Sequence, residues 1–430
     1  MGVDWIGISL LLGGFLVLMF FRVPIAFALG LSSLVVVIYL NLPMLMVAQR
    51  MVNGLNSFTF LAVPFFILVG NIMTEGGISD RLVRLADVLV GRMPGGLAQG
   101  NVVASTMFGG ISGSSVADVA SIGSFLIPAM TKNGYPAGYS VAVTVTSSVQ
   151  GVLIPPSQNM IYYALAAGGL PISTLFLAGY VPGLLLGASL MIICYIMARR
   201  HGHPMGGRYG LREGLRIMAD AGIGLFTIVI IIGGILTGVF TATESAAVAI
   251  VYALLVTVFW YRSLDARAAR RIFSTTLTTL AMVTAIIMTS SVFGFLLSFL
   301  RVPAVLADAI FSVSSEPVFV LMAVNALLLI LGMLMDMGVL ILLLTPILLP
   351  IVTKVGVDPI HFGIILILNL GIGLCTPPVG TSLLVGAGIA RITLETATRS
   401  LLPFYLAMLV VLLIVTYVPA FSLTLPALMR

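Results

Sequence analysis

Charged residues are scarce in this chain of 430 residues, since Lys, Arg, Asp and Glu together make up 8% of it. Hydrophobic residues make up 60% and the mean hydropathy is +1.21, which excludes a water-soluble domain. The net charge of +6 is spread too thinly along apolar sequence to indicate a nucleic-acid partner. The composition therefore predicts a single membrane domain over residues 1–430, an all-α polytopic protein embedded in a lipid bilayer.

Cysteine and histidine are nearly absent, which argues against several kinds of catalytic site. The two cysteines, Cys194 and Cys375, lie in different apolar segments and form neither a disulfide framework nor a metal-binding motif. His201 and His203 fall in a basic loop, and His361 stands alone. No histidine is placed for a nucleophile–base pair or a metal cluster, so the sequence does not favour an enzyme.

Two stretches, residues 107–159 and 329–381, resemble each other and interrupt the hydrophobic sequence. Each contains a Gly-containing interruption followed by a Pro-Pro pair inside an apolar segment. A Pro-Pro pair that recurs in this context indicates an internal repeat. The shift that superimposes Gly110 on Gly332 also superimposes Pro128 on Pro350, Thr131 on Thr353, Lys132 on Lys354, Gly151 on Gly373, and Pro155-Pro156 on Pro377-Pro378.

Each Pro-Pro pair is predicted to break a helix at membrane depth. Proline has no N–H, so the carbonyls of Gly151 and Val152 in the first repeat, like those of Gly373 and Leu374 in the second, lose their helical partners. In hydrocarbon such backbone is tolerated only inside protein or along a polar cavity. Two half-helix ends with free carbonyls predict a cation site beside an anion-attracting helix N-terminus. The alternative is a kink repaired by a neighbouring Ser or Thr.

The hydrophobic segments predict spans, two re-entrant hairpins and two broken helices. Residues 94–130 and 317–350 have limbs shorter than the roughly 20 residues needed to cross a bilayer, so each is predicted to be a hairpin that turns back at a polar tip. The broken helices are expected at 139–167 and 362–390. Full spans are expected at 5–21, 25–40, 58–74, 174–197, 222–239, 245–261, 277–300 and 402–418, an amphipathic surface helix at 75–93, and basic cytoplasmic connectors at 199–221 and 262–276.

Lys and Arg positions predict the orientation. With the N-terminus outside, all of the 20 basic residues except Arg50, Arg301, Lys354 and Arg430 are cytoplasmic, as the positive-inside rule requires. The first hairpin then enters from the cytoplasm and the second from the opposite face. The sequence therefore predicts two inverted repeats, at residues 24–198 and 245–420, an arrangement found in many secondary transporters.

Four motifs are specific in combination: LAVPFF at 61–66, SGSSVAD at 112–118, FTATESAA at 240–247 and TPPVG at 376–380. Together they resemble the large membrane subunit of TRAP transporters (tripartite ATP-independent periplasmic transporters), and the resemblance covers essentially the whole chain. One departure is Ala242, where proline is expected. This departure affects a helix start more than the transport site.

The resemblance implies Na⁺-driven uptake of an organic anion, usually a carboxylate, across the bacterial inner membrane by an elevator-type mechanism. It also implies two partners, a small four-helix membrane subunit and a periplasmic binding protein that delivers the substrate. Sialic acid, C4-dicarboxylates and sugar acids all remain open as substrates. A channel and an integral membrane enzyme are the alternative functions.

The resemblance further implies two Na⁺ sites, each between a hairpin tip and a broken helix, with Ser115 and Asp336 facing the substrate between the tips. Asp118 is predicted instead to be a carboxylate of a helix start, and Glu244 to cap a helix. Asp336 has no predicted capping role. The implied ligands are Ser112, Ser114, Gly151 and Ser157 for the first Na⁺ site, and Gly332, Gly373, Thr376 and Val379 for the second.

Overall fold

The computed structural model describes residues 4–207 and 209–429, and this part of the chain is helical with no β-strand. Arg208 and Arg430, which entered the charge-based orientation, lie outside the described residues. Six of the described helices are long and apolar enough to cross a membrane, or up to eight if each of two bent helix pairs counts as one span. The prediction of an all-α polytopic membrane protein is thereby confirmed.

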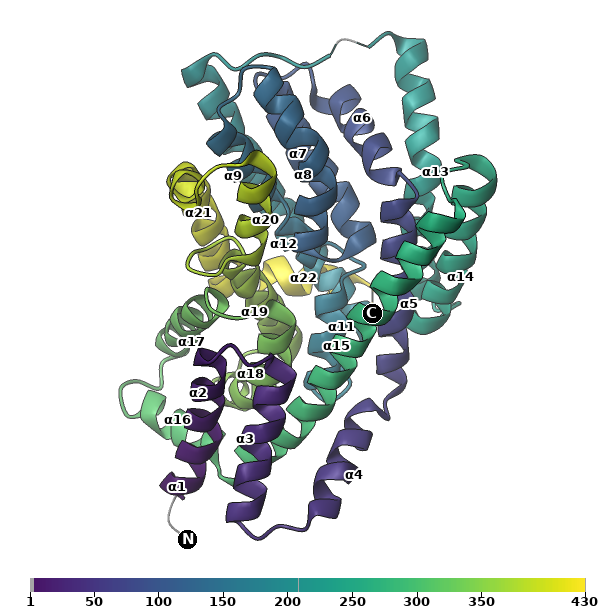
Figure 1. Ribbon diagram of the computed structural model, residues 1–430. Helices are drawn as coiled ribbons and strands as arrows, with labels where there is room; N and C mark the ends of the chain where they lie inside the picture. Colours follow the sequence, from purple (N-terminus) through teal and green to yellow (C-terminus); the bar gives the residue numbers. More distant parts are fainter. Residues whose placement is uncertain (1–3, 208, 430) are drawn as a thin grey trace.

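The N-terminal helices gather at one end of the molecule. Helices α1 (Trp5–Ile8) and α2 (Gly14–Phe20) are joined into one rod by the π-helical turn η1 (Ser9–Gly13). This rod packs against α3 (Ile25–Tyr39). The short helix α4 (Met44–Leu55), which was not predicted, then leads into α5 (Phe58–Glu75). Figure 1 shows α1 to α4 near the N-terminus, at the end opposite to the loop between α12 and α13.

The first hairpin and broken helix follow the predicted order. Helix α7 (Gly96–Ser112) turns into α8 (Ser115–Lys132) at the Gly- and Ser-rich cluster. The broken helix consists of α9 (Ala137–Ser147) and α10 (Gln150–Leu153), then α11 (Gln158–Ala166) after a bend of 48°. Helix α12 (Ile172–His201) is a full span.

The second hairpin and broken helix have the same element order. Helix α17 (Pro317–Gly332) turns into α18 (Met337–Lys354), and α19 (Pro359–Gly373) is separated by the Pro-Pro pair from α20 (Thr381–Ala390). The peptide bond within each Pro-Pro pair is cis. Helices α21 (Leu394–Tyr417) and α22 (Ala420–Leu428) complete the chain.

Long helices in the middle of the chain extend into both predicted connectors and shorten them. Helix α13 (Leu211–Leu236) already contains Arg212 and Arg216, and α15 (Ala266–Phe299) begins inside the second predicted connector. Helix α14 (Ala242–Leu255) continues into η2 (Val256–Trp260), and α16 (Val302–Phe311) follows α15. The predicted cap at Glu244 is confirmed, because Glu244 and Thr241 form a capping box at the start of α14.

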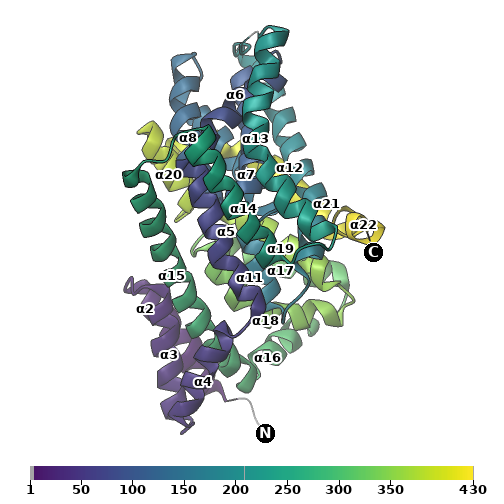
Figure 2. The same ribbon diagram turned by 90° about the vertical axis from the view of Figure 1, so that its right-hand side faces the viewer.

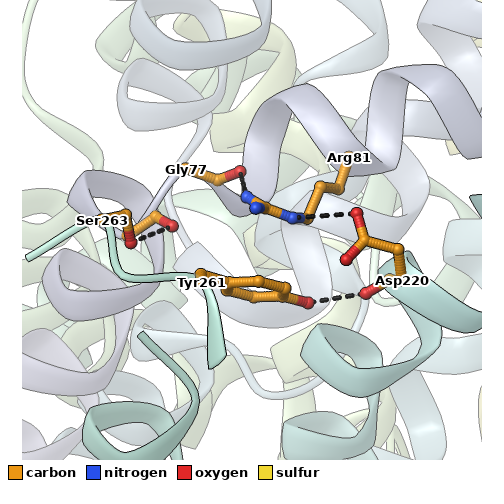
Figure 3. A network of polar contacts seen from close by, with 6 residues as sticks. Gly77, Arg81, Asp220, Tyr261 and Ser263 are labelled. Carbon is orange, nitrogen blue, oxygen red and sulfur yellow. Dashed lines mark hydrogen bonds and ion pairs between the residues drawn. The ribbon is translucent and has the colours of Figure 1, made fainter. Parts of the chain in front are cut away.

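Helix α6 (Ile78–Val90) corrects the prediction of a helix that lies on the membrane surface. Its apolar face, which includes Leu82 and Ala86, is buried against α7 and α13. The polar face is also held by protein: Arg81 Nε lies 3.1 Å from Asp220 Oδ2, and the Arg81 guanidinium lies over the Tyr261 ring at 3.6 Å. Figure 3 shows this network, in which the Tyr261 hydroxyl also donates to the Asp220 carbonyl. An amphipathic pattern predicts an apolar partner but does not say whether that partner is lipid or protein.

The two predicted repeats pack against each other, and a frame of long helices lies beside them. Helix α11 packs on α18, α20 packs on α8, and α9 packs on α21, so each broken helix contacts the other repeat. The frame is built by α15 against α3, α4 and α5, and by α14 against α5. Figure 2 shows α5, α14 and α15 across the face that is turned toward the viewer. The tip of the first hairpin, at residues 110–113, is buried inside the protein, where interrupted backbone is tolerated, whereas Asp336 of the second tip is exposed.

Candidate functional site

The tip of the first hairpin meets the break between α10 and α11. Gln158 Nε2 donates to the Ser112 carbonyl at 3.3 Å, and Asn159 Nδ2 donates to the Gly113 carbonyl at 3.3 Å. Ser114 is the N-cap of α8, and its hydroxyl accepts the N–H of Ala117. Because these two amide side chains begin α11 immediately after the break, the break itself fixes the position of the tip.

The break supplies further oxygens next to this tip. The Ser157 hydroxyl donates to the Val152 carbonyl at 2.6 Å, which satisfies one of the carbonyls that the prolines leave without a helical partner. The other carbonyl without a helical partner belongs to Gly151. This residue packs against Gly109 near the C-terminal end of α7. The structure thus brings together the residues predicted for the first Na⁺ site: Ser112, Ser114, Gly151 and Ser157.

The second tip and the second break meet in the same way. The Val379 N–H donates to the Met333 carbonyl at 3.2 Å, which ties the break to the tip. The Thr376 hydroxyl donates to the Ile372 carbonyl at 2.8 Å, just below the break. The structure therefore also brings together the second predicted set: Gly332, Gly373, Thr376 and Val379.

The carbonyls at the second break differ from the expectation that proline leaves them free. The Gly373 carbonyl accepts the Thr376 N–H at 3.0 Å, and the Leu374 carbonyl accepts the Ser382 N–H at 3.1 Å. The turn after α19 and the first turn of α20 provide these donors. The missing N–H of proline predicts only that the helical donors are lost, and it does not predict these replacements. A carbonyl oxygen has two lone pairs, so the Gly373 oxygen can still coordinate a cation.

Glycine pairs allow each tip to approach its break. A Cβ on Gly373 would lie 2.6 Å from the carbonyl carbon of Gly332, and a Cβ on Gly109 would collide with the Cα of Gly151. Backbone atoms cannot move away as a flexible side chain can. The contact between tip and break therefore requires glycine at these positions.

We expect Gly373→Ala and Gly109→Ala each to destabilise the protein by about 1–3 kcal/mol, the usual cost of overpacking a core. Gly388→Ala is the control, because Gly388 lies in α20 and a Cβ there would meet nothing within 4 Å. Thermal unfolding of the purified variants in detergent measures the effect. If Gly373→Ala and Gly109→Ala unfold at the same temperature as Gly388→Ala, the close-approach argument is wrong.

Helix ends give the two clusters their electrostatic character. The α7 and α10 helices end at the first cluster, and α17 and α19 end at the second. The C-terminal end of a helix carries a partial negative charge, and carbonyl and hydroxyl oxygens are ligands for a hard monovalent cation. The residues present therefore fit Na⁺ in donor type and in electrostatic sign. Bound there, Na⁺ would supply positive charge next to the space between the tips.

A cavity of about 640 Å³ lies between the two hairpin tips and helices α3 and α15. Asp336 lines it, is exposed, and belongs to the second tip. Ser115 lies at its edge but is buried, and its hydroxyl is 2.6 Å from the Ser148 hydroxyl and 2.7 Å from the Ser382 hydroxyl. The structure therefore places Asp336 facing the cavity, whereas the Ser115 side chain connects α8 to α9 and α20.

Asp118 lies in the first turn of a helix as predicted but is not part of a cap, whereas Asp336 is an N-cap that was not predicted. Asp336 is the N-cap of α18, and its Oδ1 accepts the Gly338 N–H at 2.9 Å. At the start of α8 the cap is Ser114, so Asp118 is not part of the cap, although its carboxylate lies in the first turn. A sequence pattern cannot decide between neighbouring candidate caps when the residue with non-helical backbone is unknown.

Four further polar residues line the cavity and were not predicted as site residues. Gln158 and Asn159 begin α11, Tyr162 lies one turn later, and Thr279 comes from α15. The Tyr162 ring packs beside Gly338 of the second tip, which joins the first broken helix to the second hairpin. The amides at positions 158 and 159, one residue after the Pro-Pro pair, were a usable signal, since polar side chains are rare in apolar segments.

The cavity has no basic side chain among the described residues that line it, and Asp336 is its one charged residue. The N-terminal ends of α8, α11 and α18, which carry partial positive charge, all contribute residues to the lining: Ser115, Gln158 and Met337. An anion in this cavity would therefore be held by helix dipoles and hydroxyl or amide groups.

Comparison with solved structures places the fold among membrane transporters. The chain superimposes on the crystal structure of the Alcanivorax borkumensis YdaH transporter with a TM-score of 0.59 at 14% sequence identity, covering 88% of this chain and 86% of that one. At this identity the likeness concerns the fold.

The sequence comparisons give the family. The model of the tripartite ATP-independent periplasmic transporter, DctM component, matches residues 12–421, and the chain belongs to this family. It is 38% identical to the C4-dicarboxylate TRAP transporter large permease protein DctM of Rhodobacter capsulatus, over 98% of this chain and 99% of that protein. It is also 38% identical to the sialic acid TRAP transporter large permease protein SiaM of Vibrio cholerae, over 96% and 97%. The chain is thus a multi-pass membrane permease component and not an enzyme.

Proposed function

We propose that the chain carries out Na⁺-coupled uptake of an organic acid anion across the inner membrane. The single observation that carries the proposal is the arrangement around the 640 Å³ cavity. Helix N-termini line the cavity itself, whereas the C-terminal ends of α7, α10, α17 and α19 converge on two oxygen-rich clusters next to it. This arrangement supports one anion between two cations, which is the pairing that a cation–anion symporter requires.

The substrate class follows from the same electrostatics. With no basic side chain among the described lining residues, the anion depends on the bound cations for compensation of its charge, so binding of substrate and Na⁺ is coupled. Two related permeases are named for C4-dicarboxylates and for sialic acid, and both compounds are carboxylates. We therefore assign a carboxylate substrate to this chain.

The transport mechanism is proposed to be an elevator built on the two inverted repeats. The interlocked hairpins and broken helices would move as one body against the frame of α3, α4, α5, α14 and α15. The cavity borders both parts, because it is lined by the tips and by the first residues of α3, Pro24 to Phe27. This start of α3 is on the predicted cytoplasmic side, so we assign the conformation to the inward-facing state.

Two partners are proposed, a small membrane subunit and a periplasmic binding protein. The family is tripartite by its description, and this chain is one component. We expect the chain reconstituted alone into proteoliposomes with an inward Na⁺ gradient to take up little labelled succinate or sialic acid. Addition of the small subunit and the binding protein encoded with it should produce uptake that stops when the Na⁺ gradient is dissipated.

Three results in this assay would argue against the proposal. Robust uptake by the isolated chain would contradict the need for partners. If uptake by the complete system does not depend on the Na⁺ gradient, Na⁺ coupling is contradicted. Equilibration of substrate without accumulation against its gradient would favour a channel.

A further inference from the structure

Asp118 is a buried carboxylate that forms no ion pair with the residues that the structure describes. It lies in the first turn of α8 and is fully buried. Neither of its carboxylate oxygens has a hydrogen-bond partner in the part of the chain that the structure describes, and no ion pair there includes it. A buried carboxylate without a partner is strongly unfavourable, and ionisable residues inside membrane proteins are rare unless they have a function.

The hairpin itself does not need a carboxylate at this position. The shift that superimposes Gly110 on Gly332 places Asp118 on Leu340, which is likewise fully buried in the first turn of α18. The second hairpin thus packs a leucine where the first packs an aspartate. Asp118 is not needed as a helix cap either, since Ser114 caps α8. Neither helix initiation nor packing explains why a charged group is kept here.

One hydroxyl group of another helix lies beside the carboxylate, and it belongs to a chain of buried polar side chains. Ser105 of α7 is the side chain next to Asp118. The Ser105 hydroxyl is 3.0 Å from the Ser147 hydroxyl of α9, and Ser147 in turn lies 3.5 Å from Asn101 Oδ1. All of these side chains are buried. Asp118 of α8 therefore lies beside Ser105 of α7, whose hydroxyl continues a buried polar chain to Ser147 of α9.

We propose that Asp118 is a ligand of an additional Na⁺ ion, with the hydroxyl oxygens of Ser105 and Ser147 as further ligands. A carboxylate and hydroxyl groups are oxygen donors of the kind that hard cations take, and a bound cation offsets the buried charge. This inference rests on the proposed Na⁺ coupling. It adds a cation position to the two clusters at the hairpin tips, since Asp118 lies one helical turn beyond Ser114, and only its backbone N–H bonds to the Ser114 carbonyl.

The additional ion has an electrical consequence. It binds to the first hairpin, so it moves together with the substrate between the two sides of the membrane. Each transport cycle then carries one more elementary charge than the two tip clusters alone account for. The coupling ratio of Na⁺ to substrate, which is a measurable number, therefore reports on Asp118.

The test uses the complete transporter in proteoliposomes, with the substrate that the parent protein takes up. The Na⁺-to-substrate ratio is obtained from the Na⁺ gradient that just balances a known substrate gradient at several membrane potentials. We expect Asp118→Asn and Asp118→Leu each to lower this ratio by one Na⁺ and to lower the cooperativity of Na⁺ activation. Asp118→Leu should fold, because the matching position of the second hairpin is Leu340.

A second measurement does not depend on transport. Na⁺ without substrate should raise the thermal unfolding temperature of the purified parent chain more than that of Asp118→Asn or Ser105→Ala. Ser124→Ala is the matched control, because the Ser124 hydroxyl lies on the same helix, is exposed, and bonds only to the Ser121 carbonyl. The control should keep the full Na⁺ response in both measurements.

The outcomes separate this inference from the proposed function. If the parent transporter is driven by Na⁺ and both Asp118 variants keep its coupling ratio, the additional site is refuted while Na⁺ coupling stands. If the variants lose coupled proton movement and keep the Na⁺ ratio, Asp118 binds a proton and the Na⁺ assignment is overturned. If the parent transporter does not respond to Na⁺, the proposed function fails first, and the additional site fails with it.

Discussion

Asp336→Asn is expected to reduce uptake roughly tenfold or more, which corresponds to at least about 1.4 kcal/mol of lost interaction, without loss of folded protein. Asp336 carries the one charge among the described residues that line the cavity, so its removal changes how cation and substrate are held. Asparagine keeps the side-chain oxygen that accepts the Gly338 N–H, and it caps helices as well as aspartate does. The substitution therefore separates the charge from the capping role.

Two further variants sharpen this test. Asp336→Ala removes both charge and cap, so it should also lower the free energy of unfolding by about 1 kcal/mol. Asp358→Asn is the matched control, since Asp358 caps α19 in the same way, through the Ile360 N–H, but does not line the cavity. Uptake rates and thermal unfolding are measured for all three. Parental uptake by Asp336→Asn would show that the carboxylate has no part in transport.

Replacement of Pro377 and Pro378 together by Ala is expected to raise the Na⁺ concentration for half-maximal uptake and to lower its cooperativity. Alanine favours a helix over proline by about 3 kcal/mol per interior position, and it restores two N–H donors. These donors compete for the carbonyls of Gly373 and Leu374, which in the structure accept bonds from the turn and from α20. The broken segment should become more continuous, and the second cluster should lose its geometry.

The matched pair, Pro155 and Pro156, should weaken the first cluster in the same way when both are replaced by Ala. Pro403→Ala is the control, because Pro403 lies inside α21 without a break in the helix. Uptake is measured across a Na⁺ series and normalised to folded protein in the membrane. A Na⁺ response that is unshifted in both double variants would favour the simple kink and refute the cation-site interpretation.

Much of the fold could be predicted because it depends on local properties. Apolar length predicts most of the spans, and the missing N–H of proline predicts where the segments after Leu153 and Gly373 stop being helical. Because the two stretches repeat at a fixed spacing, the sequence predicts the same break in the helix at both Pro-Pro pairs. The repeat pattern and the chemistry of proline predicted a cation site at each break, whereas the particular Na⁺ ligands were implied by the resemblance to the transporter family.

Partners within the protein could not be predicted in this way. The helix at 78–90 has an apolar face that either lipid or protein can cover, and the fold covers it with α7 and α13. The Gly373 and Leu374 carbonyls lose helical donors by a local rule, but the donors that replace them come from backbone whose course only the fold determines. The interlocking of α8 with α20 through Ser115 and Ser382 also joins residues that are far apart in the sequence.

The sequence by itself determined the class of protein, the positions of the breaks and the family, because these depend on composition, on the chemistry of proline and on motif identity. The tertiary structure alone decided the roles of the two intramembrane aspartates. Asp336 faces the cavity and caps a helix, whereas Asp118 is fully buried and forms no ion pair within the described part of the chain. The physical reason is that the surroundings of a carboxylate are set by the packing of helices distant in sequence, which no local pattern encodes.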